Sequence, residues 1–148
     1  MGPCEPGEFR IWRLDQVPVI VCPPEIDIAN TDAFAAALAA AEQAAAEQAA
    51  AEQSPAGQAP AEQAAATVVI DLTATTFCDC SGLRVLGPAQ ERIAARGGRL
   101  RLVTTSGVIQ LLLAMTGLEA SIPQHSTVAD AVLAARAGQD RSEPPVPH

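Results

Sequence analysis

Thr67-Val-Val-Ile-Asp-Leu-Thr-Ala-Thr-Thr-Phe-Cys-Asp-Cys-Ser-Gly-Leu-Arg-Val-Leu86 is the stretch of this 148-residue chain that decides its fold. The run Val68 to Leu72 is mostly apolar and β-branched with little alternation, which is typical of a strand covered on both faces of a sheet. A polar turn, Asp79-Cys80-Ser81-Gly82, follows and predicts a helix N-terminus with Asp79 or Cys80 as the N-cap. A buried strand that delivers an acid, a thiol and a hydroxyl to a helix N-terminus defines a chemical site on a rigid scaffold.

Ser81 is a candidate phosphoacceptor. The first N–H groups of a helix lack intrahelical partners and carry partial positive charge, so a phosphate is electrostatically tolerated there. A simpler interpretation is that Asp79 and Ser81 only cap the helix while Gly82 permits close packing. Spacing alone favours the simpler interpretation.

The strand, the Asp-x-Ser-Gly-Leu turn at 79–83 and the following helix resemble the signature of the STAS domain family, which includes bacterial anti-sigma factor antagonists. Further stretches resemble the family: Arg96-Gly-Gly-Arg-Leu-Arg-Leu-Val103, Val108-Ile-Gln-Leu-Leu-Leu-Ala-Met-Thr-Gly-Leu118, Ser126-Thr-Val-Ala-Asp-Ala131 and, upstream, Pro24-Glu-Ile-Asp-Ile-Ala-Asn-Thr31. In the last stretch, Pro24 stands in the place of the usual Gly. The resemblance spans roughly Val17 to Ala135 apart from one insertion, and ordered agreement at several places is more specific than a single motif.

The resemblance implies an α/β fold, a STAS-like mixed β-sheet with about four to five strands and four helices packed on it. It also implies a regulatory module that binds an anti-sigma factor, often a serine kinase, and thereby frees a sigma factor. An enzyme is the disfavoured alternative, because the sequence offers no nucleophile–base pairing, paired-carboxylate site, phosphate loop or metal cluster. The contact surface implied by the resemblance comprises Asp27, Thr31, Asp79, Cys80, Ser81, Gly82 and Leu83.

One departure from the family pattern concerns the switch. In phosphorylated members the acceptor Ser directly follows the Asp, and that position here is Cys80, which a Ser/Thr kinase does not ordinarily modify. Ser81 is the only nearby hydroxyl that matches a family position. Two interpretations stay open: either the switch has moved to Ser81, or the chain is an unphosphorylated scaffold or a subunit of a transporter or signalling complex. A redox role for Cys80 is a third, weaker alternative.

Composition excludes several other functions. A net charge of −8 argues against a nucleic-acid surface. We expect no membrane span, no signal peptide and a cytoplasmic location, because the chain has no run of about 18 apolar residues and its start lacks a basic segment. The spacing of the four cysteines and two isolated histidines predicts no metal site, disulfide or cofactor. Five arginines in or just after the signature helix form a local basic patch: Arg84, Arg92, Arg96, Arg99 and Arg101. We interpret it as a solvated helix face that balances Glu91, with a partner-specific patch as the alternative.

The expected organisation is a disordered N-terminus (1–8), a single domain (9–137) and a disordered tail (138–148). The predicted order is β-β-α-β-α-β-α-β-α, with an initial hairpin and a brief late strand near Ser121-Ile122. A helix capped by Asn30 or Thr31 is predicted to continue to about Gln53.

An Ala/Glu/Gln-rich insertion at about 40–66 repeats Glu every five residues, at Glu42, Glu47 and Glu52. This period places no single stripe on a helix, so we expect an exposed helical extension, with a partner-docking arm as the alternative.

The core is expected to include the apolar positions of the signature helix and the later elements. These are Leu83, Val85, Leu86, Ile93, Leu100, Leu102, Val108, Leu111, Leu112, Val132 and Leu133, with Met115 as a core filler.

Overall fold

The computed structural model describes residues 8–52 and 67–137. The expectations for 1–7, the return of the insertion at 53–66 and the tail at 138–148 lie outside these residues. Within the described part, four α-helices, one short 3-10 helix and seven strands follow one another along the chain.

The main sheet has five strands in the order β1-β2-β4-β6-β7. Their bounds are β1 Arg10–Leu14, β2 Val17–Val21, β4 Val68–Asp71, β6 Leu100–Val103 and β7 Gln124–His125. The first two strands form the predicted antiparallel hairpin, and the other pairs are parallel. Asp15 and Gln16 connect β1 to β2 with φ of 53° and 73°, the backbone that a tight two-residue hairpin loop requires. The predicted mixed α/β sheet is therefore confirmed.

A second, two-stranded sheet was not predicted. It pairs β3 (Glu25–Ile26) with β5 (Phe77–Cys78) in parallel. Flanking backbone bonds extend the pairing, since Thr76 N donates to Pro24 O at 2.8 Å and Asp79 N donates to Ile26 O at 3.0 Å. This small sheet holds the loop before the first helix against the loop before the second.

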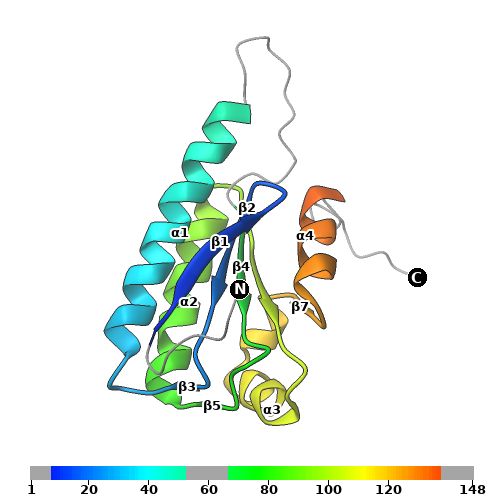
Figure 1. Cartoon of the computed structure of the whole chain (residues 1–148). Helices are drawn as coiled ribbons and strands as arrows, with labels where there is room; N and C mark the ends of the chain where they lie inside the picture. The colour runs from blue at the N-terminus through cyan, green and yellow to red at the C-terminus, as the bar shows by residue number, and fades with distance from the viewer. Residues whose placement is uncertain (1–7, 53–66, 138–148) are drawn as a thin grey trace, which may run out of the picture.

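The helices divide between the two faces of the main sheet (Figure 1). α1 (Thr31–Glu52) and α2 (Cys80–Ala95) cover one face, where Ile20, Ile70 and Leu102 join their core. α4 (Val128–Ala137) covers the other face, against Val19, Val69 and Val103. α3 (Gly107–Thr116) lies at the end of the sheet near β5, and the short helix η1 (Leu118–Ala120) follows it. Because β4 in the middle of the sheet is packed on both sides, Val68 to Leu72 has the continuous apolar character noted above.

Several predicted core positions are exposed. Val108, Leu111, Met115 and Leu133 expose 57%, 59%, 72% and 66% of their surface, so their assignment to the core was wrong. α3 contacts the core along one side only, and Ile109 and Leu113 fill that side. Val85 and Leu112 are partly buried against the core, and the other predicted positions are buried. The late strand is Gln124–His125 rather than Ser121-Ile122, because Ser121 ends η1 and Ile122 packs in the core.

The first part of the Ala-rich extension of α1 is docked rather than exposed. Ala41, Glu42 and Ala45 are buried, and Arg92 on α2 donates to both carboxylate oxygens of Glu42, at 2.7 and 3.0 Å. Alanine side chains are small enough to let the two helices approach, so no large apolar stripe is needed. The expectation of an exposed extension was therefore wrong for this segment.

Two of the five arginines do not belong to a free solvated face. Arg92 is held by Glu42, and Arg101 in β6 is only 3% exposed. Arg101 Nη1 lies 3.0 Å from His125 Nε2, so His125 is not isolated. The strand partner β7 brings these two side chains together from 24 positions apart.

Candidate partner-binding site

The two loops predicted to form the contact surface meet at one end of the molecule. Thr31 Oγ1 at the start of α1 lies 3.0 Å from Ser81 Oγ in the first turn of α2, across 50 positions of sequence. The β3–β5 pair holds this junction, because each of the two loops continues from one of its strands (Figure 1). The structure thus brings together residues that the sequence only suggested would converge.

Asp79 is the N-cap of α2. Its φ of −91° and ψ of −176° are extended, and its Oδ1 accepts from Ser81 N at 2.9 Å and Gly82 N at 3.2 Å. Ser81 N would otherwise lack a helical partner, whereas Gly82 N also donates to the backbone oxygen of Asp79 at 3.1 Å. The capping interpretation is confirmed for Asp79, while Ser81 contributes by donating its hydroxyl proton to Asp79 Oδ1 at 2.5 Å.

The Ser81 hydroxyl is engaged and only half-buried. An ionised carboxylate can only accept, so the Ser81 proton goes to Asp79. Thr31 then has one proton for two acceptors, Asp27 O at 2.8 Å and Ser81 Oγ at 3.0 Å. A phosphoryl group on Ser81 would remove the bond to Asp79 and place negative oxygens beside its carboxylate, so modification would rearrange this junction.

These contacts affect the ionisation of Asp79. Its pKa lies below the ordinary value of 3.8, chiefly because the Ser81 hydroxyl donates to the carboxylate. Burial acts in the opposite direction, and the backbone N–H groups of Gly82, Ser81 and Ile28 add further lowering. The contribution from Ile28 links the β3–α1 loop directly to the cap of α2.

We expect Ser81→Ala to raise the pKa of Asp79 toward its ordinary value, because the largest cause of the lowering is removed. A carboxyl with a lowered folded-state pKa contributes stability above its unfolded pKa and loses it as pH falls through the folded pKa. The wild-type chain should therefore retain this contribution to lower pH than the variant. An NMR titration of the side-chain carboxyl carbon measures the change. Thr73→Ala is the matched control, since that hydroxyl donates to Asp71 instead; an unchanged titration of Asp79 in Ser81→Ala would contradict the hydrogen-bonded arrangement.

Asn30 organises the other loop, although the sequence suggested it only as a helix cap. Its Oδ1 accepts from Asp27 N and its Nδ2 donates to Glu25 O, both at 2.9 Å. Asp27 Oδ1 in turn accepts from Ala29 N at 2.9 Å. The signal for this role is an asparagine just before a helix, because Asn side chains commonly bond nearby backbone in turns.

The remaining predicted residues lie at different depths. Cys80 is exposed, whereas Gly82 and Leu83 are buried beneath the junction. The neighbouring Cys78 is buried too, and this burial, followed by the negative charge of Asp79, raises the pKa of its thiol to about 12. Of these two neighbouring cysteines, Cys80 is therefore the one with an accessible thiol.

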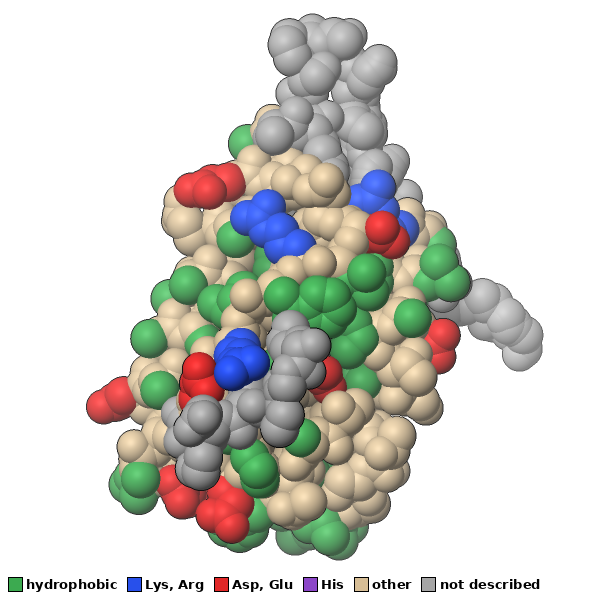
Figure 2. Space-filling view, viewed as in Figure 1, with side chains coloured by type: hydrophobic (Ala, Val, Ile, Leu, Met, Phe, Trp, Pro, Cys, Tyr) green, Lys and Arg blue, Asp and Glu red, His purple; other side chains and the backbone are tan. Residues whose placement is uncertain are grey.

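The outer surface here is acidic and apolar. Figure 2 shows acidic side chains at the lower end of the molecule, where β3 and β5 lie in Figure 1, with hydrophobic side chains beside them. Glu25 and Asp32 are exposed, and so are the large apolar side chains of Ile28 (79%) and Phe77 (47%). Such a mixture suits contact with another protein.

Among residues 8–52 and 67–137, no three His, Cys, Asp or Glu side chains are grouped to hold a metal ion. In the same part of the chain, no helix is long and apolar enough to cross a membrane.

Residues 10–131 match the model of the STAS domain, and the chain belongs to this family. Similar solved structures include an anti-sigma factor antagonist from Mycobacterium paratuberculosis, at 25% identity and a TM-score of 0.65, covering 86% of this chain and 92% of that one. An anti-sigma-factor antagonist (STAS) domain protein from Planctomyces limnophilus has 24% identity and a TM-score of 0.66, with 86% and 97% covered.

The chain also resembles part of the murine anion transporter Slc26a9, at 17% identity and a TM-score of 0.55. That match covers 85% of this chain but only 18% of the transporter, and at this identity it shows the fold alone. A comparison with curated protein sequences found no match.

Proposed function

We propose that this chain is a protein-binding regulatory module of the anti-sigma factor antagonist type, which binds an anti-sigma factor and so releases a sigma factor. The observation that carries the proposal is the hydrogen-bonded junction of the two loops, where Thr31 meets Ser81 at an acidic, partly apolar surface. Family membership and the two antagonist structures support it. The proposed activity is binding rather than catalysis, in the cytoplasm and without nucleic acid.

The proposed contact residues differ in how they act. Asp27, Thr31, Cys80 and Ser81 contribute surface, with Asp79 at their centre. Gly82 and Leu83 support that surface from beneath. Asp79 and Asn30 fix the conformation of the two loops by side-chain hydrogen bonds from backbone N–H groups. Recognition by a partner would therefore depend on the loop conformation as well as on the exposed side chains.

Binding can be tested against the anti-sigma factors encoded in the same genome by isothermal titration calorimetry. We expect one of them to bind, and Asp27→Ala and Ser81→Glu each to weaken it by about tenfold or more, typical of losing a central interface contact. Asp130→Ala is the matched control, because Asp130 is an exposed acid on α4, away from the junction. If the wild-type chain and the three variants bound with equal affinity, the contact surface would lie elsewhere. If no anti-sigma factor bound the wild-type chain, the proposed function would be contradicted.

Phosphorylation of Ser81 belongs to the same proposal. A phosphate adds about −1.5 to −2 charges, which would oppose the adjacent Asp79 carboxylate and change the surface presented to a partner. Incubation with candidate anti-sigma kinases and ATP, followed by mass spectrometry, should place one phosphate on Ser81 and none in Ser81→Ala. The Cys80→Ser variant should be phosphorylated more strongly than the wild type if the kinase recognises the exposed residue at position 80. A phosphate that persists on the domain in Ser81→Ala would remove Ser81 from the proposal.

An unphosphorylated scaffold, or a subunit of a transporter or signalling complex, is the second candidate. The side-chain arrangement favours it in one respect, because the exposed position is a cysteine while the nearby hydroxyl is half-buried and bonded to Asp79 and Thr31. Stable binding of an anti-sigma kinase without any phosphate transfer would select an unswitched module.

A further inference from the structure

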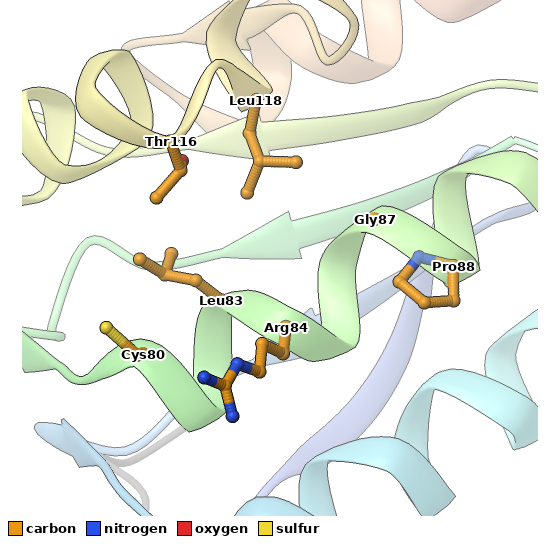
Figure 3. A pocket seen from close by; sticks show the side chains of 7 residues that line it. All are labelled: Cys80, Leu83, Arg84, Gly87, Pro88, Thr116 and Leu118. Atoms are coloured by element: carbon orange, nitrogen blue, oxygen red, sulfur yellow. The ribbon is translucent and has the colours of Figure 1, made fainter.

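An open pocket lies between α2 and the segment that joins α3 to η1, beside the candidate contact surface (Figure 3). Cys80, Leu83, Gly87 and Pro88 on α2 line it together with Thr116 and Leu118. Its volume is about 320 Å³, and most of its exposed wall is apolar. Because Cys80 also belongs to the candidate contact surface, the pocket extends that surface along α2.

Two residues in the wall are unfavourable for the helix that carries them. Glycine and proline are the poorest residues for a helix interior, and Pro88 has no N–H to donate to the carbonyl of Arg84. Packing against the rest of the molecule does not require glycine at position 87, since the nearest atom to an added Cβ outside the adjacent residues and its own helix backbone is Leu118 Cδ2, at 4.0 Å. Residues that disfavour the helix or strand in which they stand are expected at functional positions. Gly87 and Pro88 are both short, so together they leave this side of the pocket open.

The rim of the pocket carries one cation. The side chain of Arg84 borders the pocket, and its guanidinium points away from Leu118 in Figure 3. Arg84 is exposed, and within the described residues it makes no ion pair. An apolar pocket with a guanidinium on its rim is complementary to an apolar group that carries a nearby carboxylate.

We propose that the pocket receives a large apolar side chain of a protein partner, and that a carboxylate in the same partner segment pairs with Arg84. The volume lies at the lower end of the roughly 300–1,000 Å³ typical of small-molecule sites, and the pocket opens to one side. A single anchoring side chain fits these dimensions, and the neighbouring loops provide surface for the rest of the segment. The proposal rests on the proposed function, because it states the chemistry by which the binding module recognises its partner.

The test uses a library of random 12-residue peptides displayed on phage, selected against the full chain. Selected peptides should share a large apolar residue with an Asp or Glu close to it, and should shift the backbone amide signals of Leu83, Gly87 and Leu118 in NMR spectra. Arg84→Gln should weaken the selected peptides about two- to fivefold, as expected for an exposed ion pair. Replacing the Asp or Glu of these peptides by Asn or Gln should weaken their binding to the wild-type chain by the same factor. The same replacement should leave their affinity for the Arg84→Gln variant unchanged.

Gly87 variants separate binding from folding. Gly87→Met should fill the pocket and weaken the peptides by about tenfold or more, and Gly87→Ala, which adds a single methyl group, should weaken them less. Glu91→Met is the control, since it places the same side chain one turn further along α2 at an exposed position outside the pocket.

The outcomes are decisive in each case. The proposal is overturned if no peptide is selected, if selected peptides share no acidic residue, or if they shift amides elsewhere. It is also overturned if sedimentation shows a dimer of this chain that Gly87→Met dissociates, because a second copy would then occupy the pocket. A chain that binds such peptides here but binds no anti-sigma factor would support this inference and contradict the proposed function.

Discussion

Gly82→Ala is expected to lower the free energy of unfolding by about 2 kcal/mol, within the range for overpacking a core. An added Cβ would lie 2.7 Å from Ile26 Cγ2 and 2.8 Å from Cys78 Sγ. Neither atom can withdraw easily, because both side chains are buried and belong to the paired strands β3 and β5. Urea denaturation measures the loss, and the loops at the partner-binding junction should loosen with it, as seen by faster amide hydrogen exchange at Ser81.

The same helix offers a matched control for this prediction. Gly87→Ala makes an identical chemical change, but outside the adjacent residues and the backbone of its own helix no atom would lie closer than 4.0 Å to the added Cβ. The helix propensity of alanine would contribute up to about 1 kcal/mol, and the crowding of this Cβ against Pro88, the next residue, opposes that gain. Gly87→Ala is therefore expected to lose clearly less stability than Gly82→Ala. Equal losses would mean that the close approach of α2 to the small sheet does not determine the effect of Gly82→Ala.

Arg92→Met is expected to destabilise the chain by about 2 kcal/mol, because it leaves the Glu42 carboxylate buried without its partner. The side chain of Glu42 is only 7% exposed, whereas that of Arg92 is 51% exposed. Fully buried pairs lose about 3–5 kcal/mol when one partner is removed, and the exposure of Arg92 lets water reach this pair and reduces the loss. Urea denaturation measures the loss in the free energy of unfolding. Faster amide hydrogen exchange at Ala41 and Ala45 should report local detachment of α1.

A double variant tests the cause of that loss. Glu42→Leu combined with Arg92→Met replaces the pair with apolar side chains, which is often neutral or stabilising. We therefore expect the double variant to be more stable than Arg92→Met alone, with a coupling energy of at least about 1 kcal/mol. If the two substitutions were simply additive, the ion pair would not be what attaches the helix.

The parts of this fold that could be predicted from sequence are those with local signals. A β-branched run without alternation marks a strand packed on both faces, and an aspartate before an apolar helical pattern marks an N-cap. Both expectations hold at Val68 and at Asp79. The convergence of Asp27 with Ser81 was suggested by family resemblance rather than by any local pattern.

The parts that were missed depend on distant partners. β3 and β5 are two residues each, too short to show a period, and they become strands only because they meet each other. Alanine is compatible with either exposure or burial, so the docking of Ala41 could not be read from composition. The burial of Glu42 depends on Arg92, 50 positions away. Likewise, α3 is apolar on nearly every side, and periodicity alone does not say which side meets the core.

The Glu42–Arg92 pair also marks the part of the Ala/Glu/Gln repeat that packs against the rest of the domain. Glu47, one repeat later, is exposed, and its carboxylate accepts from Gln43 within α1, at 3.0 Å. Each five-residue unit adds about 7.5 Å of helix and a rotation of roughly 500°. Gain or loss of units beyond Ala45, the last of the buried residues of α1, would lengthen or shorten the helix without shifting the register of α1 on α2. The repeat can therefore vary in number while the proposed contact surface at the opposite end of the helix is unaffected.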